Sequence, residues 1–160
     1  MTRATIIILI SFQLGLCYKT YSQTMDSVSS TWRTEPTGDF YKKYSPLDYL
    51  RILKDDFKRK DKLNVFTAMS SPDNWVKEEH IGDLIKLIYS TDSTKSIMNV
   101  LSSYLPTDKF SSIGREAQNL IECFRTKKSY PTFLNSFGPH DKTKGKEIED
   151  WWTKYKSGKP

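Results

Sequence analysis

Four ionisable side chains, Glu78, Glu79, His80 and Asp83, form the densest titratable cluster in the sequence. If this stretch is helical, residues three or four apart share a face, which would bring His80 or Glu79 beside Asp83. A metal site usually needs three or four such ligands, and the His-Glu-x-x-His signature of zinc proteases is absent. We therefore interpret the cluster as the acidic first turn of a helix, with a metal or catalytic site as the alternative.

Two further residues, Cys123 and His140, carry side chains that take part in many reactions. Cys123 would act as a nucleophile only with a histidine base near it, and its place between Leu120 and Phe124 in an apolar helical pattern favours a packed side chain. His140 lies beside Asp141 without a second spaced histidine, which is typical of a surface loop. The sequence also lacks a Gly-rich phosphate loop, a Gly-x-Ser-x-Gly elbow and a metal-spaced set of Cys and His. We expect no catalytic residue, metal or cofactor, and an enzyme is disfavoured.

The last predicted helix, over about residues 146–156, carries an unusual group of aromatic side chains. Trp151 and Trp152 are adjacent, and adjacent helix residues point about 100° apart, so both cannot pack on one narrow face. The favoured interpretation is that the two Trp side chains anchor a terminal helix. The alternative is that, with Tyr155 and the basic residues Lys154 and Lys156 nearby, they form an aromatic and basic surface for a protein or glycan partner. The candidate partner-binding residues are Trp151, Trp152, Lys154 and Tyr155.

Residues 1–22 predict a secretory signal peptide. Arg3 is followed by an apolar run of about 13 residues that ends at Leu16, which is shorter than the roughly 20 residues that span a bilayer and is typical of a signal-peptide core. The small side chains of Ser22 at position −1 and Thr20 at position −3 suit cleavage by signal peptidase before Gln23. We therefore expect an exported protein that is periplasmic or secreted.

Two alternatives to cleavage before Gln23 remain open. The stretch Leu14-Gly15-Leu16-Cys17 resembles the lipobox of bacterial lipoproteins, in which the Cys is acylated, although Leu16 stands where that motif has Gly, Ala or Ser. Acylation of Cys17 would place the protein on a membrane through a lipid anchor. The second alternative is an uncleaved N-terminal anchor.

The composition is typical of a soluble protein with one domain, because 37% of the 160 residues are apolar and 28% are charged. Removal of residues 1–22 takes away Arg3 and Lys19, which lowers the formal net charge from +6 to +4. So small an excess of positive charge does not predict nucleic-acid binding. Cys123 would then be the one remaining cysteine, so the fold cannot depend on an internal disulfide.

Hydrophobic periodicity predicts an all-α fold. Its clearest part is the stretch 73–106, which we expect to form two antiparallel helices joined by a short turn, with Asp73 as the N-cap and Pro106 as the end. Two apolar sets, separated by a polar break at 90–93, carry this prediction: Ile81, Leu84, Ile85 and Ile88, and then Ile97, Met98, Leu101 and Leu105.

Cap signals predict further helices on either side. Ser45 and Pro46 are typical of a helix start, and residues 63–69 predict a short second helix. Ser111 or Ser112 caps another helix, with Glu116 in the capping-box position. The apolar faces of these helices are Leu47, Leu50, Leu53 and Phe57; Leu63, Phe66, Ala68 and Met69; and Ile113, Ala117, Leu120, Ile121 and Phe124.

Helix starts near Pro46, Lys77 and Ser112 each open a two-helix unit. Their spacing is within the range of helical-repeat proteins, so we predict a small helical-repeat-like bundle of about three antiparallel helix hairpins over residues 46–157. An irregular globular bundle is the alternative. Residues 23–45 are interpreted as a polar and aromatic arm or linker that precedes this single domain.

Four sequence patterns between Trp75 and Tyr155 resemble a group of small exported helical proteins from Bacteroidetes-type bacteria. They are W-V-K-E-E-x-I-x-x-L-I-x-L-I, S-S-Y-L-P, S-x-x-G-x-E-A-x-x-L-I-E-x-F-R and E-I-x-x-W-W. The resemblance implies export and an all-α fold, and it implies no active site. His80 stands where we expect an acidic residue in that group, which weakens any site built on its turn.

Export, a small single domain and the lack of a catalytic set favour a non-enzymatic interaction protein. We expect an unidentified protein partner in the envelope or outside the cell. The more specific form of this hypothesis is an immunity-type inhibitor that covers a partner's active site with a helical face. One alternative is an envelope hydrolase that uses the acidic cluster near His80. The other is an envelope scaffold that is lipid-anchored through Cys17.

Overall fold

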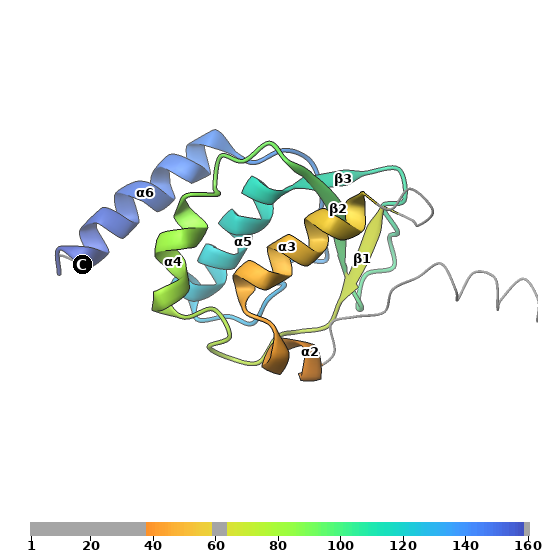
Figure 1. Ribbon diagram of the computed structural model, residues 1–160, viewed down its shortest axis with the longest axis horizontal. Coiled ribbons are helices and arrows are strands. Elements are labelled where there is room, and N and C mark those ends of the chain that lie inside the picture. Colours follow the sequence, from red (N-terminus) through yellow and green to blue (C-terminus); the bar gives the residue numbers. More distant parts are fainter. Residues whose placement is uncertain (1–37, 59–63, 159–160) are drawn as a thin grey trace, which may run out of the picture. The chain divides into compact units, whose positions relative to one another are not determined.

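The computed structural model describes residues 38–58 and 64–158, which form a mixed α/β fold (Figure 1). The elements follow the chain in the order α2 (Gly38–Lys43), α3 (Pro46–Phe57), β1 (Val65–Ala68), α4 (Glu78–Ile85), β2 (Ser93–Asn99), β3 (Phe110–Ser112), α5 (Ile113–Thr126), β4 (Asn135–Ser136) and α6 (Lys142–Lys156). The predicted signal peptide, Cys17 and most of the predicted arm lie outside the described residues.

The four strands form one sheet in which β2 is central. β1 runs parallel to the second half of β2, from Val65 opposite Ser96 to Ala68 opposite Asn99. On the other edge of β2, β3 pairs antiparallel with residues 93–95 and β4 pairs antiparallel with residues 97–98. β2 therefore uses both of its edges, and all of its residues after Ser93 are buried.

The prediction of an all-α, helical-repeat-like bundle is wrong, as is the all-α fold implied by the resemblance. The second half of the expected central hairpin is strand β2 and the loop after it, and the expected short helix at 63–69 contains strand β1. A strand that is buried on both faces shows no alternation of polar and apolar residues, so periodicity cannot distinguish it from a short buried helix. Leu101, which we had placed on a core face, is 81% exposed.

Helices whose starts carry a cap signal are present where the sequence predicts them. The Ser45 side chain accepts a 3.2 Å hydrogen bond from the Asp48 backbone N–H at the start of α3, and Ser112 accepts one of 3.1 Å from Arg115 at the start of α5. The expected N-cap at Asp73 is wrong, because α4 begins at Glu78 with Lys77 as its N-cap.

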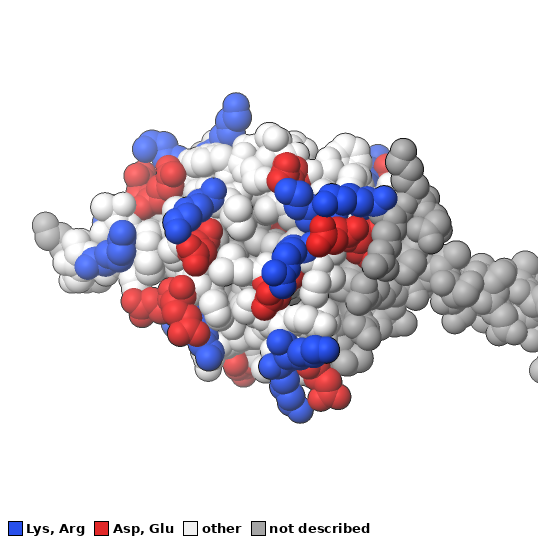
Figure 2. Space-filling view, viewed as in Figure 1, with Lys and Arg blue, Asp and Glu red and all other residues white. Residues whose placement is uncertain are grey.

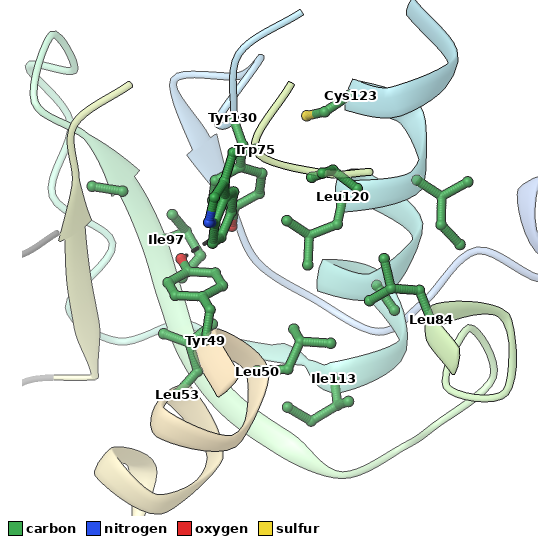
Figure 3. Packing of buried hydrophobic residues seen from close by; sticks show 14 of the residues in the cluster. Tyr49, Leu50, Leu53, Trp75, Leu84, Ile97, Ile113, Leu120, Cys123 and Tyr130 are labelled. Atoms are coloured by element: carbon green, nitrogen blue, oxygen red, sulfur yellow. Dashed lines mark hydrogen bonds between the residues drawn. The ribbon is translucent and has the colours of Figure 1, made fainter. Parts of the chain in front are cut away.

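The core lies where α3 packs on β2 and where α4 and α5 pack together. Figure 3 shows Tyr49 and Leu53 of α3, Ile97 of β2 and Leu120 of α5 directed toward one another. Each of these four side chains is completely buried, and such burial stabilises a fold by about 1.5–3 kcal/mol per large side chain. The same core cluster includes Phe40 of α2 and Ile148 of α6, so residues from both ends of the described chain share one core.

One ion pair is buried between α3 and the sheet. Lys95 of β2 lies 2.9 Å from the carboxylate of Asp56, and each side chain is only 2% exposed. Removing two charges from water is unfavourable unless they neutralise one another, so this pair fixes where the end of α3 sits on β2.

Candidate functional site

The acidic cluster lies at the start of α4, where its three carboxylates have different partners, although Glu79 also lies 3.7 Å from Nε2 of His80. Glu78 accepts a 3.1 Å hydrogen bond from the Tyr155 hydroxyl, and Asp83 forms a 2.7 Å ion pair with Lys86. Glu79 is exposed beside Lys77, at 3.8 Å. A catalytic or metal site requires ligands that converge on a common point, and these carboxylates do not.

His80 has a local structural role. Its Nδ1 accepts a 3.1 Å hydrogen bond from the backbone N–H of Lys77, which satisfies a donor at the start of α4. Partial burial lowers the pKa of His80, because it disfavours the charged imidazolium. Over residues 38–58 and 64–158, no three His, Cys, Asp or Glu side chains come close enough to hold a metal ion.

Cys123 and His140 lie on different elements and are not paired. Cys123 is 1% exposed on α5, and burial raises the pKa of its thiol to about 12. His140 precedes α6, and its ring packs edge-on against Tyr89 with centroids 5.9 Å apart. A thiol with so high a pKa remains protonated at neutral pH and is a poor nucleophile.

The four aromatic rings at the end of α6 and on α5 pack into one cluster. Trp152 stacks on Tyr155 with ring centroids 5.3 Å apart and an interplanar angle of 13°. Trp151 lies 5.7 Å from Trp152 and 6.2 Å from Phe124 of α5. Trp151 and Trp152 are half-buried and Tyr155 is 41% exposed, so the cluster anchors α6 and also faces solvent.

Three basic groups lie over these rings. The guanidinium carbon of Arg125 is 5.1 Å from the centre of the Trp151 ring, and the ammonium of Lys156 is 5.6 Å from that of Trp152. Lys127 lies over Phe124 at 4.4 Å. We call the set Phe124, Arg125, Lys127, Trp151, Trp152, Lys154, Tyr155 and Lys156 the aromatic–basic surface.

The lysines of this surface are not neutralised by ion pairs with other described residues. Arg125 is paired with Glu122, but none of Lys127, Lys154 and Lys156 has an ion-pair partner within the described chain. Lys154 and Lys156 lie in the last turn of α6, where they also offset the negative end of the helix dipole. Figure 2 shows charges of both signs interspersed over the viewed face.

A hydrogen bond between α4 and α6 fixes the position of the stacked rings. The Tyr155 hydroxyl donates to Glu78 across a sequence separation of 77 residues, and the neighbouring carboxylate raises the pKa of this phenol. Sequence reasoning placed Glu78 and Tyr155 in different candidate sites, because nothing in either local pattern shows that the two helices meet. Phe124 and Arg125 were missed for the same reason.

A second polar cluster is buried between α5 and the short strands β3 and β4. Glu116 of α5 accepts hydrogen bonds of 2.6 Å from Ser111, 2.6 Å from Ser136 and 2.9 Å from Tyr130. Burial raises the pKa of its carboxyl group, although these donors oppose the shift. The predicted capping-box role of Glu116 is wrong, since its side chain links α5 to β3 and β4.

Comparisons with protein-family models, with curated proteins and with solved structures give no match. Among the described helices, none combines the length and the apolar character that crossing a bilayer requires.

Proposed function

We propose that this protein is an exported, non-enzymatic binding module that holds an acidic partner protein on its aromatic–basic surface. The observation that carries the proposal is a cluster of partly exposed rings beside three lysines that have no ion-pair partner in the described chain. Trp, Tyr and Arg are the residues most enriched among binding hot spots. The partner is expected to be acidic because the free lysines offer it complementary charge.

Rigidity of the surface supports this proposal. The four rings contact one another, and the Tyr155 hydroxyl is bonded to Glu78. Side chains that are already ordered lose little conformational entropy when a partner binds, so more of the contact free energy remains as affinity. A surface of this kind fits an inhibitor of the immunity type, which covers a partner's active site.

Export is supported by the sequence of residues 1–22, and we place the partner in the envelope or outside the cell. The full chain, tagged at its C-terminus and expressed in its own host, would be used to capture partners from envelope and culture fractions. We expect one protein to be retained at low salt and released as salt rises, since charge pairs at the rim of an interface are screened.

The matched variants are Trp152→Ala and Tyr104→Ala. Both remove a large aromatic side chain, but Tyr104 is 51% exposed in the loop between β2 and β3, away from α6. Trp152→Ala should lower the yield of the captured protein several-fold, whereas Tyr104→Ala should leave it unchanged. Equal yields from both variants, or capture of a polysaccharide in place of a protein, would refute the proposed function.

A further inference from the structure

Exposed apolar side chains gather at one end of the sheet. β1 and β2 run parallel and end side by side at Ala68 and Asn99, and the first residue of β4, Asn135, pairs with Met98 next to this end. The backbone N–H of Val100 donates a 3.2 Å hydrogen bond to the Ala68 carbonyl, so the chain stays beside β1 after β2 has ended. The large apolar side chains next to these strand ends are exposed by 45–81%: Met69, Val100, Leu101 and Leu134.

Two aromatic rings extend this group of side chains. The backbone N–H of Asn99 donates a 2.8 Å hydrogen bond to the Leu134 carbonyl, which holds the segment around β4 against the end of β2. Phe137 directly follows β4, and its ring lies 6.5 Å from that of Tyr104 in the loop after β2. The two rings are 37% and 51% exposed, respectively. We call the set Met69, Val100, Leu101, Tyr104, Leu134 and Phe137 the sheet-end surface.

The segments that form the sheet-end surface carry no charge. Residues 64–72, 100–107 and 129–139 contain no Asp, Glu, Lys or Arg, although 28% of the whole chain is charged. The first charged residues after the second segment, Asp108 and Lys109, pair with each other at 3.2 Å. Depletion of charge, together with aromatic and Met side chains, is typical of the core of a protein–protein interface.

The sheet-end surface is large for a protein that acts alone. If a large side chain has a full surface of about 200 Å², the exposed fractions of these six side chains leave about 600 Å² in contact with solvent. The largest apolar patch on a typical monomer is about 300–600 Å². Two such surfaces placed face to face would bury about 1,200 Å² in total, which is the lower limit for a specific, stable interface.

We propose that the sheet-end surface joins two copies of this chain in a symmetric dimer. In a two-fold dimer the same patch lies on both sides of the interface, so the patch must be complementary to itself. A chain with a net positive charge repels its own copy where charged surfaces meet, whereas an uncharged apolar patch does not. The acidic partner proposed above finds no opposite charge here, which favours a second copy as the occupant. The sheet-end surface shares no residue with the aromatic–basic surface.

Sedimentation equilibrium of the chain purified from its own host tests the dimer. We expect the mass to rise from one copy to two as concentration increases, with a dissociation constant in the micromolar range, because the buried area is at the lower limit for a stable interface. Leu101→Lys brings one added positive charge from each copy into the interface and should raise the dissociation constant at least tenfold. Leu101 is 81% exposed, so the change leaves the fold of each copy intact. Thr91→Lys, the same added charge at an exposed position before β2, should keep the constant within twofold.

Three results would overturn the dimer. They are a monomer at every concentration up to the millimolar range, a dimer that Leu101→Lys does not weaken, and a dimer that Leu101→Lys and Thr91→Lys weaken equally. In a monomer, nuclear Overhauser contacts between the Leu101 or Leu134 methyl groups and residues 23–37 would assign the surface to that arm of the same chain. Trp152→Ala should leave the dissociation constant of the dimer unchanged, so the dimer and the proposed function are judged separately.

Discussion

The Tyr130 hydroxyl donates a 2.9 Å hydrogen bond to the carboxylate of Glu116, and both side chains are completely buried. Tyr130 in turn lies 3.1 Å from the Tyr49 hydroxyl, which acts as the donor because the Tyr130 proton is used on Glu116. This chain of hydrogen bonds connects α5 to α3. It extends through Ser111 and Ser136 to the two short strands beside β2.

The raised pKa of Glu116 predicts that stability changes with pH. Because the carboxyl group binds its proton more tightly in the folded chain, its contribution is fully present below the ordinary glutamate pKa of about 4.3 and is lost as pH rises through the higher folded pKa. Glutamine does not titrate, so Glu116→Gln should remove the part of the fall in stability with rising pH that comes from this carboxyl group. Urea unfolding of both proteins at a series of pH values measures the difference, and parallel pH profiles would contradict the assignment.

Glu116→Ala, which removes the side chain, should lower the free energy of unfolding more than Glu116→Gln, which only neutralises it. Glu116→Ala leaves the buried hydroxyls of Ser111, Ser136 and Tyr130 without their acceptor. We expect the free energy of unfolding to fall by about 3 kcal/mol or more. Glu116→Gln keeps one acceptor oxygen and should lose less, as chemical denaturation of the two variants would show.

Two leucines that the sequence assigns to equivalent apolar faces should differ sharply in how much their replacement by alanine lowers the free energy of unfolding. Leu84 is completely buried on α4, whereas Leu101 is 81% exposed in the loop after β2. Leu84→Ala should therefore cost about 2–5 kcal/mol, and Leu101→Ala less than about 0.5 kcal/mol. Thermal or urea unfolding checks both, and a large loss for Leu101→Ala would place the 100–109 loop in the core.

Two glycines provide a second matched pair. A Cβ on Gly114 would lie 2.6 Å from the Ser90 carbonyl oxygen and 2.8 Å from that of Ile88, so the backbone would have to move. Gly114→Ala is expected to destabilise the fold by about 1–3 kcal/mol. A Cβ on Gly82 would meet no atom within 4 Å, and Gly82 is exposed on α4, so Gly82→Ala should stabilise the helix by about 0.5–1 kcal/mol. An unchanged free energy of unfolding for Gly114→Ala would show that α5 does not pack closely on the turn that contains Ile88 and Ser90.

The buried ion pair predicts strong coupling between Lys95 and Asp56. Lys95→Met removes the ammonium group that lies 2.9 Å from the buried Asp56 carboxylate, which should cost about 3–5 kcal/mol. Combining Lys95→Met with Asp56→Leu should recover much of this loss, because two apolar side chains need no neutralisation. A double-mutant cycle of unfolding free energies measures the coupling, and additive losses would mean that the pair is solvated.

Sequence reasoning located the helices that carry strong local signals. Ser45 with Pro46 and Ser112 identify α3 and α5, since an N-cap acts only on its own helix. The strands were missed because β1 and β2 are buried and β3 and β4 have only three and two residues. The roles of Lys95 and Glu116 depend on partners in other elements, so no local pattern shows them.

The candidate partner-binding residues were named from α6 alone. Adjacent Trp residues on one helix single out Trp151, Trp152 and Tyr155 as candidates, and the structure brings their rings into one cluster. The contributions of Phe124, Arg125 and Lys127 come from the packing of α5 beside α6.

The central claim is that a partner protein binds on the aromatic–basic surface, and the dissociation constant of the captured partner tests it most directly. Titration calorimetry would compare the unaltered chain with Trp152→Ala, with Lys154→Ala plus Lys156→Ala, and with the control Tyr104→Ala, each checked for an unchanged fold. We predict that Trp152→Ala weakens binding by more than about 1 kcal/mol, a factor of about five, and that the lysine variant reduces the salt dependence. Unchanged affinity in the first two variants would contradict the claim and leave the aromatic cluster as an anchor for α6.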